Sequence, residues 1–112
     1  MKTQIEQIEN EVMTAYCDCN NQHPFNCRNL NFRASGAVSR DDAARILSKA
    51  IPDGYNEFNF SLLNKFPRNA QFVIAREGSV CLYISGDELP SAAKVLADEK
   101  SQEGVETRFW WD

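Results

Sequence analysis

The sequence predicts an α+β protein with a mostly antiparallel sheet. Three features support this prediction: apolar residues at helical spacing near the N-terminus, two strand-like runs around Glu77-Gly78, and an aromatic strand-like run at the C-terminus. Apolar residues three and four positions apart indicate a helix with one buried face, whereas alternation indicates a strand. The 112 residues are close to the usual length of one domain. We therefore expect a single domain over residues 1–112.

The first predicted helix begins near Thr3 and ends before Pro24. Its apolar stripe consists of Ile5, Ile8, Val12, Ala15, Tyr16 and Cys19. Thr3 and Glu6 match a capping box, in which two side chains satisfy free backbone N–H groups at the start of a helix. Proline cannot continue a helix, and the Asn-Asn-Gln run at residues 20–22 favours an earlier end.

A short strand and a second helix are predicted next. Leu30 and Phe32 alternate with polar residues in Asn29–Ala34. The helix begins after Ser39, whose side chain is a good N-cap. Its apolar face consists of Ala43, Ile46, Leu47 and Ala50, and Pro-Asp-Gly at residues 52–54 ends it. Residues 55–66 fit either a strand or a helical turn, so both alternatives stay open.

The clearest strand signal is a hairpin formed by Ala70–Arg76 and Ser79–Ser85. Glycine at position 78 supplies the positive φ of a tight turn. Pairing Arg76 with Ser79 would place Phe72, Ile74, Cys81 and Tyr83 on one face, and Val73, Ala75, Val80, Leu82 and Ile84 on the other. Both faces would then be apolar. We expect cover on both sides, from the protein's own helices or from a partner.

A third helix is predicted from Pro90 to about residue 97, and a last strand from Val105 to Trp111. Without the first helix and the undecided residues, the order is βαββαβ, which is the ferredoxin-like arrangement. Two helices would cover one face of the sheet, and the N-terminal helix would lie across the other. In this arrangement the last strand is an edge strand, whose free backbone groups can recruit another chain.

The chain is acidic, with a net charge of −4 that is unevenly distributed. Residues 1–27 carry −3, residues 28–49 carry +3, and residues 87–112 carry −4. An acidic chain is poorly suited to phosphate contacts, each of which needs a lysine or arginine. We therefore expect a protein partner with a basic surface rather than a nucleic acid.

No apolar run approaches the roughly 18 residues of a membrane-spanning helix. Residues 1–10 lack the basic start and apolar centre of a signal peptide. We expect a cytoplasmic protein that does not enter a membrane. In that compartment the four cysteines are expected to be thiols or metal ligands rather than disulfides.

One local cluster has the ligands of a metal site. Cys17, Cys19, His23 and Cys27 follow the spacing C-x-C-x3-H-x3-C, and three thiolates with one imidazole match a structural zinc site. Paired cysteines of zinc sites usually have two or more residues between them. On a continuous helix, moreover, Cys17 and Cys19 would point in different directions. We expect packed thiols without a cofactor, and zinc binding is the alternative.

Catalytic patterns are missing from the sequence. It has neither the phosphate-binding pattern GxxxxGK[ST] nor GxGxxG, and no GxSxG nucleophile elbow. A single histidine limits acid–base catalysis, and Cys81 lies inside a predicted strand as a core residue. We therefore expect no enzymatic activity.

The last strand is the candidate partner-binding element. Alternation points Thr107, Phe109 and Trp111 to one side, and Glu106, Arg108 and Trp110 to the other. In one alternative, Phe109 and Trp111 enter the core and Trp110 packs under the N-terminal helix. In the other, one of the two tryptophans stays exposed and anchors a partner, since Trp and Arg are enriched at binding hot spots. The candidate partner-binding residues are Glu106, Arg108, Trp110 and Trp111.

Together these features predict a small acidic interaction protein, an inhibitor or adaptor that binds a macromolecular partner. In size and charge alone, the chain is similar to inhibitors encoded by phages and mobile elements, such as anti-CRISPR proteins. A homodimer through the same edge strand is equally compatible. The alternative function is a zinc-stabilised nucleic-acid-binding module, which would combine the cysteine–histidine cluster with Arg28, Arg33, Arg40 and Arg45.

Overall fold

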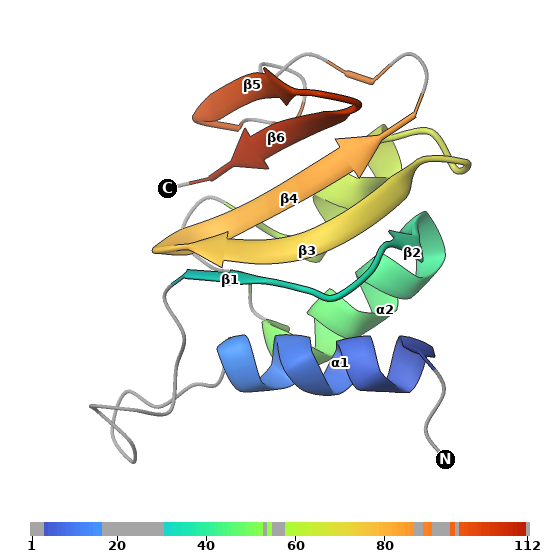
Figure 1. Cartoon of the computed structure of the whole chain (residues 1–112), viewed down its shortest axis with the longest axis vertical. Coiled ribbons are helices and arrows are strands. Elements are labelled where there is room, and N and C mark those ends of the chain that lie inside the picture. Colours follow the sequence, from blue (N-terminus) through green and yellow to red (C-terminus); the bar gives the residue numbers. More distant parts are fainter. Residues whose placement is uncertain are drawn as a thin grey trace.

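A six-stranded sheet organises the fold (Figure 1). The computed structural model describes residues 4–16, 31–52, 54, 58–86, 89–90, 95 and 97–111. Its elements are α1 (Gln4–Ala15), β1 (Asn31–Arg33), β2 (Val38–Ser39), α2 (Arg40–Ala50), the 3₁₀ helix η1 (Phe60–Lys65), β3 (Gln71–Glu77), β4 (Ser79–Ser85), β5 (Glu99–Glu103) and β6 (Glu106–Trp110). All described strand pairs are antiparallel, which confirms the predicted α+β class with its mostly antiparallel sheet.

Both helices bury the apolar faces that their spacing predicts. The Ser39 side chain accepts a hydrogen bond from the backbone N–H of Asp42 and caps α2, as expected. The buried residues are Ala43, Ile46 and Leu47 in α2, and Ile8, Val12 and Ala15 in α1. Ile5, which the predicted stripe also includes, is exposed. The predicted cap residue Thr3, the last stripe residue Cys19 and the predicted end of this helix before Pro24 lie outside the described residues.

α2 lies behind the sheet, whereas α1 lies along the β1 side of the sheet and packs against α2 (Figure 1). Glu9 of α1 accepts hydrogen bonds from Arg45 at 2.8 Å and from Lys49 at 3.0 Å. Beyond the end of α1, the Tyr16 hydroxyl donates to the carbonyl of Ala75. The prediction that the N-terminal helix lies across the second face of the sheet is therefore wrong, since these contacts hold α1 beside α2.

β3 and β4 form the predicted hairpin, but the predicted register is wrong by one residue. Arg76 pairs with Val80 rather than with Ser79, and Gly78 forms the bend with a φ of 78°. A shift of one residue moves the side chains of one strand to the opposite face relative to the other. Phe72, Ile74, Val80, Leu82 and Ile84 therefore share one face, and Val73, Ala75, Cys81 and Tyr83 share the other. The large apolar residues thus gather on a single face.

The ferredoxin-like strand order is not confirmed. The order is β1-β3-β4-β6-β5, with β2 also paired to β3. A ferredoxin-like order would place β1 between the hairpin and the last strand, whereas here β6 pairs directly with β4. Alternating apolar residues determine which face a strand buries, but not which strand lies beside it.

β5 is a strand that the sequence pattern did not predict. Its sequence, Glu-Lys-Ser-Gln-Glu, is entirely polar, yet it pairs with β6 through a tight turn at Gly104, whose φ is 66°. As a result β6 is an inner strand, and the prediction that the last strand forms the sheet edge is wrong. Of the predicted third helix, residues 91–94 and 96 lie outside the described residues, and Val95 is helical and buried.

An aromatic cluster fills the core between the sheet and η1. Phe58 contacts Trp111 edge-to-face with ring centroids 4.9 Å apart. Phe66 makes similar edge contacts with Phe72 and Phe109, at 5.7 and 5.2 Å. Within the undecided stretch, residues 60–65 thus form a 3₁₀ helix that carries its neighbouring aromatic residues into the core, while residues 55–57 lie outside the described part of the chain.

Candidate interaction surface

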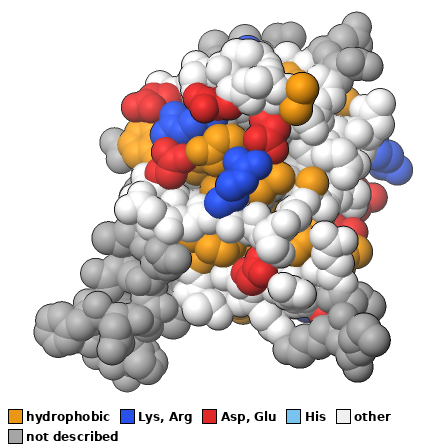
Figure 2. All heavy atoms as spheres, in the orientation of Figure 1, with side chains coloured by type: hydrophobic (Ala, Val, Ile, Leu, Met, Phe, Trp, Pro, Cys, Tyr) orange, Lys and Arg blue, Asp and Glu red, His pale blue; other side chains and the backbone are white. Residues whose placement is uncertain are grey.

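One face of the sheet is covered by no described helix (Figure 1) and carries charged and hydrophobic side chains (Figure 2). We call it the outer face, as opposed to the core face that packs on α2 and η1. The strand register assigns to it Arg33, Glu77, Cys81, Tyr83, Glu99, Glu106, Arg108 and Trp110. Figure 2 shows acidic, basic and apolar side chains close together on this face.

Glu77 is the centre of a hydrogen-bonded network on the outer face. Its Oε1 accepts hydrogen bonds from Nε and Nη2 of Arg108, at 3.1 and 2.7 Å. Its Oε2 accepts one from the Tyr83 hydroxyl and lies 3.6 Å from the Cys81 sulfur. The hydrogen bonds from Arg108 hold the pKa of Glu77 below its ordinary value. The same contact raises the pKa of Arg108, so both groups are charged at neutral pH.

A second ion pair extends the network toward β1. Arg33 donates two hydrogen bonds to the carboxylate of Glu106, at 2.9 and 2.8 Å. The Arg33 guanidinium also lies over the Tyr83 ring, 4.5 Å from its centroid. Burial raises the pKa of Tyr83, with a further contribution from its hydrogen bond to Glu77, so this phenol stays protonated. The ring is thus fixed between a cation above it and a carboxylate at its hydroxyl.

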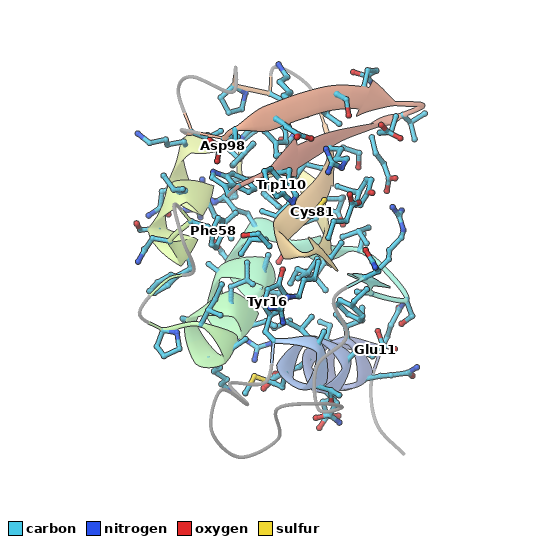
Figure 3. The ribbon with its side chains drawn as sticks, turned by 90° about the vertical axis from the view of Figure 1, so that its left-hand side faces the viewer. Glu11, Tyr16, Phe58, Cys81, Asp98 and Trp110 are labelled. Carbon is cyan, nitrogen blue, oxygen red and sulfur yellow. The ribbon has the colours of Figure 1, made fainter. Side chains whose placement is uncertain are left out.

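The two tryptophans at the C-terminus lie on opposite faces. Trp111 is fully buried in the core, where its Nε1–H donates to the carbonyl of Val95 at 2.9 Å. Trp110 is half-buried on the outer face and donates to the backbone carbonyl of Glu77 at 2.9 Å. It lies opposite Cys81 in the sheet (Figure 3).

The four residues predicted to bind a partner therefore separate. The structure brings Glu106, Arg108 and Trp110 together on the outer face and places Trp111 in the core. The expectation that Phe109 and Trp111 enter the core is confirmed. The expectation that Trp110 packs under the N-terminal helix is wrong, because α1 lies along the β1 side of the sheet.

The sequence pattern missed Arg33, Glu77 and Tyr83 as members of this surface. Arg33 comes from β1, far along the chain from the other two, whereas Glu77 and Tyr83 belong to the consecutive strands β3 and β4. The sequence pattern predicts Glu77 in the turn of the hairpin, and the predicted register places Tyr83 beside Phe72 and Ile74 on an apolar face. The correct hairpin register would have placed Glu77 and Tyr83 on one face.

Cys81 has no nucleophilic character in this environment. The residue is fully buried, and burial is the main cause that raises the pKa of its thiol to about 12. The thiolate, which is the reactive form of cysteine, is therefore not populated at neutral pH.

The predicted metal ligands cannot be placed in the structure, because Cys17, Cys19, His23 and Cys27 all lie outside the described residues. Within the described part of the chain, no three His, Cys, Asp or Glu side chains gather as they would around a metal ion. None of the described helices has the length and hydropathy of a membrane span.

A scan against protein-family models finds no match, and no curated protein or solved structure matches the chain. The fold and the surface therefore define only a general class. It is an α+β protein whose antiparallel sheet packs on helices with one face and presents paired charges and aromatic rings on the other.

Proposed function

We propose that this chain is a small non-enzymatic interaction protein that binds a protein partner through its outer face. The observation that carries the proposal is the pair of half-buried aromatic side chains, Tyr83 and Trp110, held by hydrogen bonds on a face that no described helix covers. Tyrosine, tryptophan and arginine are the residues most enriched at binding hot spots. Side chains that are already fixed lose little conformational entropy when a partner binds.

The charge on this face favours a basic partner. Two arginines, Arg33 and Arg108, lie among carboxylates that outnumber them: Glu77, Glu99, Glu103 and Glu106. Complementary charge accelerates association and excludes partners of like charge. An excess of carboxylates would repel the phosphates of a nucleic acid.

The proposed role is that of a cytoplasmic inhibitor or adaptor, of the kind that phages and mobile elements encode. Its support is the small size and acidity of the chain, together with a surface whose charged groups are already ordered. Cys81 itself is unsuited to thiol catalysis, since it is buried and burial raises the pKa of its thiol.

The test begins with the full chain as bait in an extract of the cells that make it. The captured partner is identified by mass spectrometry and purified, and its affinity is measured by calorimetry for the wild type, Trp110→Ala and Met13→Ala. Trp110→Ala should weaken binding about 30-fold, the effect of losing a hot spot of about 2 kcal/mol. Met13→Ala is the matched control, because Met13 is an exposed apolar residue on α1, and its affinity should stay within about twofold of the wild type.

Two further measurements make this test decisive. Circular dichroism and urea unfolding show whether Trp110→Ala is folded at the assay temperature, and Trp110→Phe provides a milder variant of the same position. Affinity should fall with increasing salt, because charged groups contribute to binding. Equal affinity for wild type and both folded Trp110 variants would refute the outer face as the binding surface.

A further inference from the structure

β5 is the outermost strand on the C-terminal side of the sheet (Figure 1). It pairs with β6 and with no other described strand. Its residues Glu99, Lys100, Gln102 and Glu103 are exposed, and Ser101 is half-buried. An edge strand of this kind presents backbone N–H and C=O groups with which a further strand can pair.

The register shows which backbone groups of β5 face outward. The N–H of Trp111, just after β6, donates to the carbonyl of Val80 on β4 at 3.0 Å. Because successive residues of an antiparallel strand bond to opposite sides, the even-numbered residues of β6 bond toward β5. Their partners in β5 are the odd-numbered residues. Lys100 and Gln102 therefore direct their backbone groups away from β6, to the edge with which no described strand pairs and which we call the free edge.

The side chains of β5 give this edge a specific charge pattern. Glu99, Ser101 and Glu103 lie on the outer face. Glu99 forms an ion pair with Arg108 at 3.0 Å. Glu103 lies directly opposite Glu106 across the hairpin, and opposed like charges destabilise a strand pair.

The two opposed carboxylates differ in their partners. Glu106 is paired with Arg33. Within the described part of the chain, Glu103 accepts a hydrogen bond from the Ser101 hydroxyl at 3.0 Å and forms no ion pair. A cation from outside the chain would therefore relieve the repulsion between Glu103 and Glu106.

The same pattern discriminates between the strands that could pair with this edge. In the fullest antiparallel pairing of β5 with a second copy, centred on Ser101, Glu99 would face Glu103 of the copy at both ends. These contacts oppose like charges and are unfavourable. A strand with lysine or arginine at two positions four residues apart would instead place a cation opposite each glutamate.

We propose that the free edge of β5 binds a basic extended segment of the partner as an additional antiparallel strand. The backbone of Lys100 and Gln102 supplies the strand hydrogen bonds, and Glu99 and Glu103 select lysine or arginine at two positions of that segment four residues apart. This inference rests on the proposed function, because it states how a basic protein partner is held. It adds to the proposed function that the edge of the sheet, and not only the outer face, recognises the partner.

The probe for this proposal is a synthetic seven-residue peptide with lysine at its second and sixth positions and threonine and valine between them. Its titration into the full chain is followed by the backbone amide signals in two-dimensional NMR. The signals of β5 should shift and saturate at millimolar peptide, whereas those of α1 should not. A peptide with glutamate in place of both lysines should cause no shift in β5.

Glu103→Lys tests the charge selection, and its exposed position makes it compatible with the fold. It should weaken binding of the lysine peptide about 5- to 30-fold, because an attractive cross-strand pair becomes a repulsive one. Glu6→Lys is the matched control, since it changes the net charge equally at an exposed site on α1, and it should leave binding unchanged.

Three results would overturn the proposal: no shift in β5 with the lysine peptide, equal binding of both peptides, or equal binding by Glu103→Lys and wild type. The charges of β5 would then act only to prevent sheet-to-sheet aggregation. If the peptide test fails but the captured partner still binds Trp110→Ala more weakly than wild type, the assignment of binding to the edge of β5 is wrong and the proposed function stands. If the folded Trp110 variants instead keep their affinity for the partner, the outer face is not the binding surface, and the peptide result is unaffected.

Discussion

Glu77 connects β3, β4 and β6 through side-chain hydrogen bonds with Tyr83 and Arg108. The pKa of Glu77 in the folded chain lies below its ordinary value of 4.5, chiefly because Arg108 donates to its carboxylate. The folded state therefore holds the proton less tightly than the unfolded state. Its contribution to stability is complete above about pH 4.5 and is lost as the pH falls through the folded-state pKa.

Glu77→Gln should therefore lower the free energy of unfolding at pH 7 by about 1 kcal/mol. The value is at the low end for a charged hydrogen bond, because 34% of the Glu77 side chain is accessible to water. Urea unfolding at pH 7 and at pH 3 measures the free energy of unfolding of variant and wild type. The difference between the two free energies should be smaller at pH 3.

The control for this prediction is Glu103→Gln, which removes an outer-face carboxylate without an ion pair in the described part of the chain. Its effect on the free energy of unfolding should stay within about 0.5 kcal/mol. A difference between Glu77→Gln and wild type that is as large at pH 3 as at pH 7 would show that the charge of Glu77 does not contribute.

At the scale of elements, the start of α2 provides a direct test of capping. The Ser39 hydroxyl oxygen accepts from the backbone N–H of Asp42 at 3.2 Å. Ser39→Ala leaves that N–H without its side-chain acceptor and should lower the free energy of unfolding by about 1 kcal/mol. Ser39→Thr keeps a capping hydroxyl and should retain most of the stability. Thermal or urea unfolding compares the three proteins, and equal losses for both variants would mean that β2 packing, rather than the cap, is affected.

The elements themselves were predictable to different degrees. α2 and its Ser39 cap follow from the sequence because capping depends on local residue types. The β3–β4 hairpin was also predictable, but not its register, since Gly78 alone forms the bend between paired residues. β5 was not predictable from apolar alternation, because its five residues are polar and it is stabilised by pairing with β6.

At the scale of the whole molecule, the α+β class was predictable and the strand order was not. Periodicity encodes which residues of an element share a side, and it placed Phe109 and Trp111 together on the side that is buried. Neighbour relations depend on connections between distant segments, which periodicity does not contain. The candidate surface was predictable only in part. Glu106, Arg108 and Trp110 come from one strand and could be placed on one face by alternation. Arg33, Glu77 and Tyr83 lie beside them because of the strand order of the sheet.

The two adjacent tryptophans provide a test of the whole arrangement, because the sheet separates them. Trp111 contacts Phe58 and Phe109 in the core, whereas Trp110 lies half-buried on the outer face. Trp110→Phe leaves Trp111 as the only tryptophan, so its fluorescence should be blue-shifted and poorly quenched by acrylamide. Trp111→Phe leaves Trp110, whose emission should be red-shifted and more readily quenched.

The two tryptophan variants should also differ in their free energy of unfolding. Trp111→Phe creates space in a fully buried site and removes a hydrogen bond to Val95, so it should lower the free energy of unfolding by about 2–3 kcal/mol. Trp110→Phe should cost about 1 kcal/mol, because the smaller ring keeps much of the contact and one hydrogen bond is lost. Equal quenching of the two single-tryptophan proteins, or a larger loss for Trp110→Phe, would contradict the assignment of these residues to opposite faces. The outer face would then lose the aromatic anchor on which the proposed binding depends.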